Sequence, residues 1–224
     1  MSLNKNSLRT QHALFSPSQP SWLNYSDEEF ISKLQTKYRS AIGTEIHEWA
    51  AVKINLGHKV SSLREIYKDI ETHIYEKYYS DDYGLSDYGL VLLKNLKYVP
   101  EETYGTVKSY INDCVGFHMD TEVLLDFSEN FFGTSDAVKH DGNGLKIFDL
   151  KTGSAPAKMD QSLIYAALYL LKNRIDPKTI PVELRIYQNN DILRARPTEE
   201  EIIPVMNTII HFDKIMDNFK GGAM

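Results

Sequence analysis

The spacing of apolar residues changes near residue 118, and this change constrains the fold more than any other feature of the chain. Before it, apolar side chains recur every three or four positions, as in the series Leu63, Ile66, Ile70 and Ile74, which is the period of an amphipathic helix. After it, short runs rich in β-branched and aromatic residues alternate with turn residues, which is typical of strands. We therefore predict a mainly helical region over 27–117 and a sheet-containing region over 118–224.

Helix-start and helix-stop residues divide the first region. The acidic run beginning at Asp27 suits a helix N-terminus. Gly57 is a C-terminal stop signal, and Ser62 can cap the helix that follows. Five helices are expected, beginning near Asp27, Ser40, Leu63, Ser86 and Glu101.

The second region reads as three strands, a helix, two strands and a final helix. The tetrapeptide Asp141–Gly144 predicts a tight hairpin, because Gly and Asn accept the positive φ of such turns. Thr198 with Glu201 forms a capping box before the last helix. The expected strands cover 121–127, 132–140, 145–151, 182–188 and 192–196, and the expected helices cover 158–173 and 198–219. This order predicts one α/β (mixed α+β) domain over 1–224, with a central mixed sheet flanked by helices.

Composition narrows the possible functions. The net charge of −6 and the pI near 5.7 argue against a protein that coats DNA electrostatically. The single cysteine, Cys114, excludes an intramolecular disulfide framework and a four-cysteine iron–sulfur cluster. The sequence contains no run of 18 apolar residues, so no membrane span is expected. The first 15 residues lack an apolar signal core. A cytoplasmic protein with no membrane partner is expected.

Two aspartates and a lysine surround the predicted hairpin. A turn at Gly142 and Asn143 would place Asp136 opposite Asp149 on the neighbouring strand. Lys151 is two residues beyond Asp149 and so points to the same face. Opposed carboxylates repel unless a cation compensates, and Mg²⁺ or Mn²⁺ held there could activate water against a phosphodiester. The alternative is a surface salt bridge of Lys151 with one of the aspartates.

Other polar residues carry weaker signals. A four-residue turn over 128–131 would put Val123 opposite Asp136, so Glu122 is expected to face away from the hairpin site. Glu48 is expected to be a solvated helix residue. The tyrosines between 75 and 88 suit either helix packing or stacking on single-stranded bases. The chain has no P-loop, so ATP-driven translocation is not encoded in it.

Four segments in order resemble RecB-type nucleases of the PD-(D/E)XK superfamily, especially small phage-borne members. They are Gly43–Ala50, Gly133–Asp136, Ile147–Gly153 and Gln161–Tyr169, and the resemblance extends over about 16–171. The Ser-rich opening with a tryptophan is also similar. The chain departs from the family where Ser135 replaces a frequent proline and where no cysteine is available for the iron–sulfur cluster of many relatives.

The resemblance implies a role for each matched residue. His47, Asp136, Asp149 and the backbone carbonyl of Leu150 would bind one or two Mg²⁺ or Mn²⁺ ions. Lys151 would act as the catalytic lysine. The pair Gln161 and Tyr165, four residues apart on a helix, would support the site and contact DNA.

The resemblance implies metal-dependent hydrolysis of DNA. The favoured activity is that of an exonuclease in phage-type recombination, replication or repair. A structure-specific endonuclease and a catalytically silent binding or regulatory module on the same fold are the alternatives. DNA and a single-strand annealing or single-strand-binding protein are the expected partners. Self-association is compatible with the resemblance. If the protein is phage-encoded, it would act in the cytoplasm of the host cell.

Overall fold

The computed structural model describes residue 15 and residues 20–221. Most of the Ser-rich opening segment, and the first 14 residues, in which no apolar signal core was expected, lie outside the described residues. Helices are η2 (Pro20–Asn24), α1 (Asp27–Asn55), α2 (Leu63–Tyr78), α3 (Asp87–Leu96), α4 (Glu101–Phe117), α5 (Asp160–Asn173) and α6 (Glu199–Lys220). Strands are β1 (Tyr79–Ser80), β2 (Gly84–Leu85), β3 (Asp120–Asp126), β4 (Phe132–Asp141), β5 (Gly144–Leu150), β6 (Val182–Gln188) and β7 (Asp191–Ala195).

One long helix, α1, replaces the two helices expected between Asp27 and Leu56. Its N-terminus is fixed by a capping box in which Ser26 accepts from the Glu29 amide and the Glu29 carboxylate accepts from the Ser26 amide. The prediction of a break near Ser40 was wrong because no proline or other stop signal lies there. Gly43 stays helical, and its missing side chain lets Thr152 approach: a Cβ on Gly43 would lie 2.6 Å from the Thr152 hydroxyl oxygen.

The five main strands form one mixed sheet in the order β3-β4-β5-β6-β7, and each begins and ends within one residue of its predicted bounds. β5 and β6 are parallel and are connected through α5, whereas the other neighbours are antiparallel. The β4–β5 hairpin turns at Gly142 and Asn143 as predicted, with Ala137 opposite Phe148. The short β1–β2 hairpin was not predicted.

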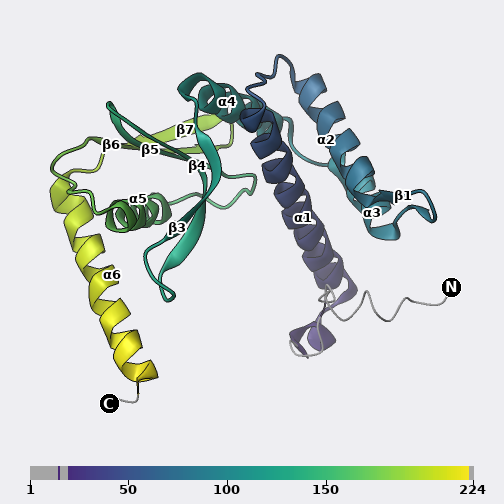
Figure 1. Cartoon of the computed structure of the whole chain (residues 1–224). Helices are drawn as coiled ribbons and strands as arrows, with labels where there is room; N and C mark the ends of the chain where they lie inside the picture. The colour runs from purple at the N-terminus through teal and green to yellow at the C-terminus, as the bar shows by residue number, and fades with distance from the viewer. Residues whose placement is uncertain (1–14, 16–19, 222–224) are drawn as a thin grey trace.

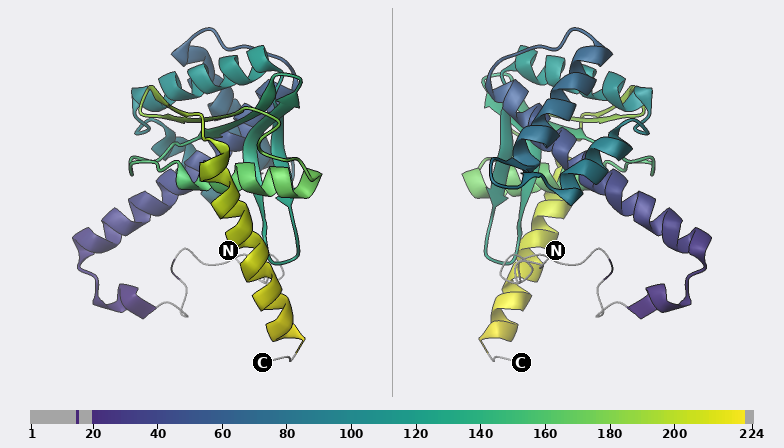
Figure 2. Two further views of the ribbon diagram at one scale, coloured as in Figure 1. Left: turned by 90° about the vertical axis from the view of Figure 1, so that its left-hand side faces the viewer. Right: turned by 90° about the vertical axis from the view of Figure 1, so that its right-hand side faces the viewer.

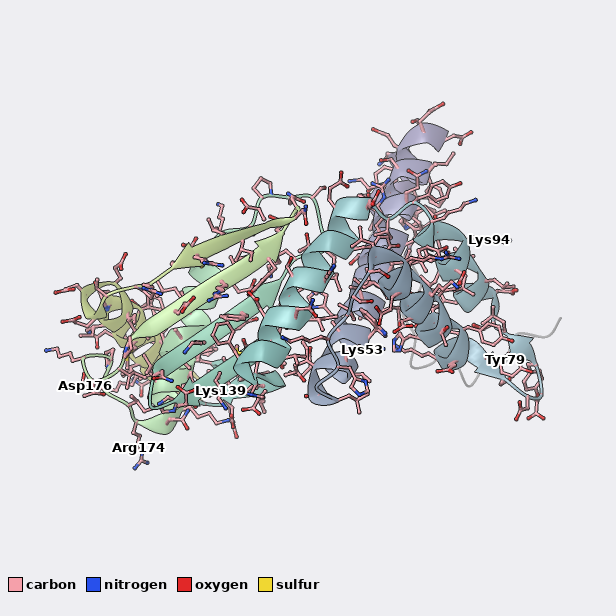
Figure 3. The ribbon with its side chains drawn as sticks, turned by 90° about the horizontal axis from the view of Figure 1, so that it is seen from above. Lys53, Tyr79, Lys94, Lys139, Arg174 and Asp176 are labelled. Carbon is pink, nitrogen blue, oxygen red and sulfur yellow. The ribbon has the colours of Figure 1, made fainter. Side chains whose placement is uncertain are left out.

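Helices cover both faces of the sheet. On β5, Phe148 and Leu150 pack towards α1 and α4, while Leu145 and Ile147 pack towards α5 and α6, as expected for alternating strand side chains. Figure 3, seen from above, shows α4 between the sheet and the group α1–α3. The N-terminal half of α1 and the C-terminal half of α6 extend beyond the rest of the molecule (Figures 1 and 2). Because one face of β5 packs towards α1 and the other towards α5, the C-terminal end of β5 lies between these two helices.

The start of β5 depends on a glycine. Gly144 has a φ of 112°, and a Cβ there would lie 2.3 Å from the Pro181 carbonyl oxygen, which accepts the Leu145 amide at 2.9 Å. We expect Gly144→Ala to lower the free energy of unfolding by about 3 kcal/mol, because the strained φ and the clash add. Gly142→Ala is the matched control, since its Cβ would meet open space. Equal urea midpoints for the two variants would contradict this account.

Among the residues the structure describes, none of the helices is long and apolar enough to cross a membrane.

Candidate metal centre

The two aspartates of the hairpin lie at its open end. The β4–β5 ladder runs to the pair Ala137–Phe148, one pair short of Asp136 and Asp149. Instead of facing Asp149 across a regular ladder, Asp136 accepts a 2.8 Å hydrogen bond at Oδ2 from the backbone N–H of Leu150. The register was predicted correctly, but the ladder ends before the two carboxylates. This bond orients Asp136 towards the end of β5.

Asp149 is the more unusual of the two carboxylates, because only 2% of the residue is exposed. Lys151 donates to its Oδ1 at 3.2 Å and lies 2.9 Å from its Oδ2, without the alignment of a hydrogen bond to that atom. Burial and repulsion from Asp136 raise the pKa of Asp149, and Lys151 and His47 offset this only in part. A buried, repelled carboxylate is what a bound cation would relieve.

Lys151 is held by the helix that follows it. Its ammonium donates to Oε1 of Gln161 at 2.9 Å, and the Gln161 amide donates to the Tyr165 hydroxyl at 2.8 Å. Tyr165 packs against Gly133, where a Cβ would lie 3.1 Å from its ring. The chain of contacts runs from Asp149 through Lys151 and Gln161 to Tyr165, so the structure brings these predicted site residues together.

His47 reaches the same place from α1. Its Nδ1 lies 3.5 Å from Oδ2 of Asp136. Burial lowers the pKa of His47, but the hydrogen bond and charge of Asp136, with smaller contributions from Asp149 and Glu122, outweigh burial and raise it overall. An imidazole beside two carboxylates is a ligand set that suits Mg²⁺ or Mn²⁺, with the nitrogen favouring Mn²⁺.

Glu122 belongs to this group, contrary to prediction. The loop between β3 and β4 contains five residues, 127–131, rather than four, because Asp126 rather than Phe127 pairs with Phe132. The extra residue shifts the register by one, so that Glu122 and not Val123 is in register with Asp136. Glu122 has a φ of 51°, a left-handed conformation that is uncommon outside functional sites and turns. Burial, and then the Asp136 charge, raise its pKa.

A cavity of about 990 Å³ opens beside these residues. Its walls come from α1, from the start of α4 and from the loop after β5. His47, Glu48, Glu122 and Asp136 line one part of it, whereas Asp149, Lys151, Gln161 and Tyr165 do not line it. The described lining also includes the basic residue Arg39. The carboxylates therefore meet open space from the α1 side.

A second group of potential ligands lies where α1 faces α2. Glu45, Glu48 and His73 have ligand atoms within 4.8 Å of one another and could hold a metal ion. Lys77 already fills this position: its ammonium lies 3.0 Å from a Glu45 oxygen and 2.5 Å from a Glu48 oxygen, and Tyr78 donates to Glu45 at 2.8 Å. Glu48 is about half exposed, as expected. This network clamps α2 to the part of α1 that carries His47.

Two of the five tyrosines between 75 and 88, Tyr78 and Tyr88, contribute to helix packing. Tyr78 and Tyr88 meet edge to face at 5.3 Å. Tyr75 and Tyr79 stack at 5.2 Å and stay partly exposed. The exposed pair lies on α2 and at its end, so base stacking stays a prediction.

No protein-family model matches the chain, and a search of curated proteins finds no significant match, so the geometry of this site carries the functional argument alone.

Proposed function

We propose that the chain is a metal-dependent DNA nuclease with a PD-(D/E)XK-like core, acting as an exonuclease in phage-type DNA recombination, replication or repair. The observation that supports this best is the buried Asp149 carboxylate beside Asp136, with Lys151 within 3.2 Å of it. Two neighbouring carboxylates, one of them buried, lower the free energy of unfolding unless a cation compensates their charge. Such unfavourable groups are found most often at functional sites.

The donor set fits a divalent cation. Oxygen atoms of Asp136 and Asp149, the ring nitrogen of His47 and the carbonyl of Leu150 would hold Mg²⁺ or Mn²⁺. Asp149 Oδ2 is buried and makes no aligned hydrogen bond with a described residue, although the Lys151 ammonium lies 2.9 Å away, so this oxygen can still accept a cation. When bound, the ion would lower the pKa of a water and neutralise charge on the scissile phosphate.

The protein residues would divide the remaining work. Lys151 would position or deprotonate the attacking water and stabilise the developing negative charge. Gln161, held by Tyr165, would fix the direction of the Lys151 ammonium. The Leu150 amide would keep Asp136 oriented. Glu122, in register with Asp136, would add a third carboxylate on the cavity side. DNA partners and self-association remain predictions.

Digestion of end-labelled DNA tests the proposal. Linear single-stranded, linear duplex and circular molecules are incubated with Mg²⁺, Mn²⁺ or EDTA. We expect the linear molecules to be degraded only with metal and circular DNA to stay intact. Cutting of circles would indicate an endonuclease instead. Metal binding without cleavage of any DNA would favour a silent binding module and overturn the proposal.

A further inference from the structure

One arginine of the cavity, Arg39, has no ion-pair or hydrogen-bond partner among the residues that the structure describes. Arg39 lines the cavity from α1, and it forms no ion pair or hydrogen bond with any residue that the structure describes. The cavity contains three carboxylates, Glu48, Glu122 and Asp136, yet none is within 4 Å of its guanidinium. Arg39 is exposed, and without a carboxylate partner among the described residues its guanidinium can bind an anion from outside.

The position of Arg39 separates it from the metal centre. It precedes His47 by eight residues on the same helix, which corresponds to about 12 Å along the helix axis. On this side of α1, Thr36 precedes Arg39, and Ser40 and Gly43 lie between Arg39 and His47, and all three line the cavity. Positions 36, 40, 43 and 47 follow the helical repeat, so they form one stripe on this side of α1. The stripe carries hydroxyls and a glycine rather than acids, and it connects the cationic end of the cavity to the carboxylate end.

We propose that the Arg39 end of the cavity binds a phosphate group of a DNA strand whose scissile bond lies at the His47–Asp136 end. Guanidinium binds phosphate through two parallel hydrogen bonds, which fixes position as well as adding affinity. Ser40 and Thr103, which line the same cavity, supply hydroxyl donors for the phosphate oxygens. Arg39 thus fixes the point along the strand at which the metal centre cuts. This inference rests on the proposed nuclease function and names a subsite for its substrate.

The size of the cavity favours single-stranded over duplex DNA. Its volume of about 990 Å³ is at the upper end for small-molecule sites, so it holds a few nucleotides. A space for only a few nucleotides takes one strand rather than both strands of a duplex. A stacked strand rises about 3.4 Å per nucleotide, so about 12 Å between Arg39 and His47 spans three to four steps. The strand therefore enters unpaired and is held by a phosphate a few nucleotides from the cut.

Binding to a variant that does not cleave tests this directly. Lys151→Ala protein is titrated with Mg²⁺ and a fluorescent hexathymidylate bearing a 5′-phosphate, a 3′-phosphate or hydroxyls at both ends, and anisotropy is measured at several salt concentrations. Arg39→Gln is added to this background, with Arg64→Gln as the matched control, because Arg64 is also an exposed helix residue and does not line the cavity. Arg39→Lys tests whether charge alone suffices.

We expect Arg39→Gln to weaken binding about tenfold, as loss of one charge-assisted contact does. The salt dependence should become shallower by about 0.7 in log–log slope, and Arg39→Lys should recover only part of the affinity. If the loss is confined to one phosphorylated end, Arg39 binds the terminal phosphate; if it is uniform, Arg39 binds an internal one, and both support the proposal. Arg39→Gln binding as tightly as Arg64→Gln would overturn it while leaving the nuclease function standing. Absence of cleavage by the unmodified protein together with absence of binding would overturn both.

Discussion

Replacing Lys151 by alanine is expected to reduce DNA cleavage on the order of 10³-fold with little change in stability. The ammonium contacts the Asp149 carboxylate at 2.9–3.2 Å and Gln161 at 2.9 Å, so it is held where it can act on a water or on a developing charge. Loss of one positioned acid–base or charge-stabilising group costs about 10²–10⁴ in rate. About a third of the Lys151 side chain is exposed, so its removal leaves no large cavity.

The measurement is single-turnover cleavage of end-labelled DNA with saturating Mn²⁺, alongside thermal unfolding. Lys146→Ala is the control, because Lys146 lies on β5, the strand that precedes Lys151, but outside the site. Cleavage within tenfold of the unmodified protein after Lys151→Ala would remove Lys151 from the mechanism. A large loss in both variants would point to a change in the sheet rather than in the chemistry.

Local sequence signals predicted the sheet well, because the hairpin at Gly142 and Asn143 leaves one low-strain register. That register predicted correctly that Asp136 and Asp149 would share one face at the end of the hairpin. Capping residues and the spacing of apolar residues also predicted where most helices lie. The continuity of α1 was missed, because a new helix start was expected near Ser40 although no proline or other stop signal precedes it.

The composition of the site was only partly predictable, because it depends on single-residue differences in loops and on contacts between distant segments. Glu122 was missed when one residue, Phe127, joined the β3–β4 loop rather than the strand pair. No local pattern encodes the positive φ of Glu122 or the fact that Arg39 faces the cavity. The placement of His47 beside Asp136 was expected only from the family resemblance, since α1 and β4 are far apart in sequence.

Asp149→Asn is expected to abolish cleavage and, in the absence of metal, to stabilise the fold by about 1–3 kcal/mol at neutral pH. The carboxylate is buried against Asp136, and this raises its pKa above that of an unfolded aspartate. Because the folded state holds the proton more tightly, the metal-free protein loses stability as pH rises from the ordinary aspartate pKa, about 3.9, through the raised folded-state pKa. Asparagine has the same shape and no charge, so this part of the pH dependence should disappear.

Divalent metal should reverse the ranking of the two proteins, which separates a metal site from a merely strained carboxylate. Mn²⁺ at about 100 times its dissociation constant should raise the free energy of unfolding of the unmodified protein by about 2.7 kcal/mol and leave Asp149→Asn unchanged. Urea unfolding at pH 5 and pH 8, with EDTA or Mn²⁺, measures both effects, and Asp120→Asn, at an exposed position on β3, is the control. If Asp149→Asn is less stable than the unmodified protein in EDTA, the Lys151 ion pair outweighs the repulsion from Asp136. The folded state would then favour the charged carboxylate without metal, and the argument for a cation at this position would lose its physical basis.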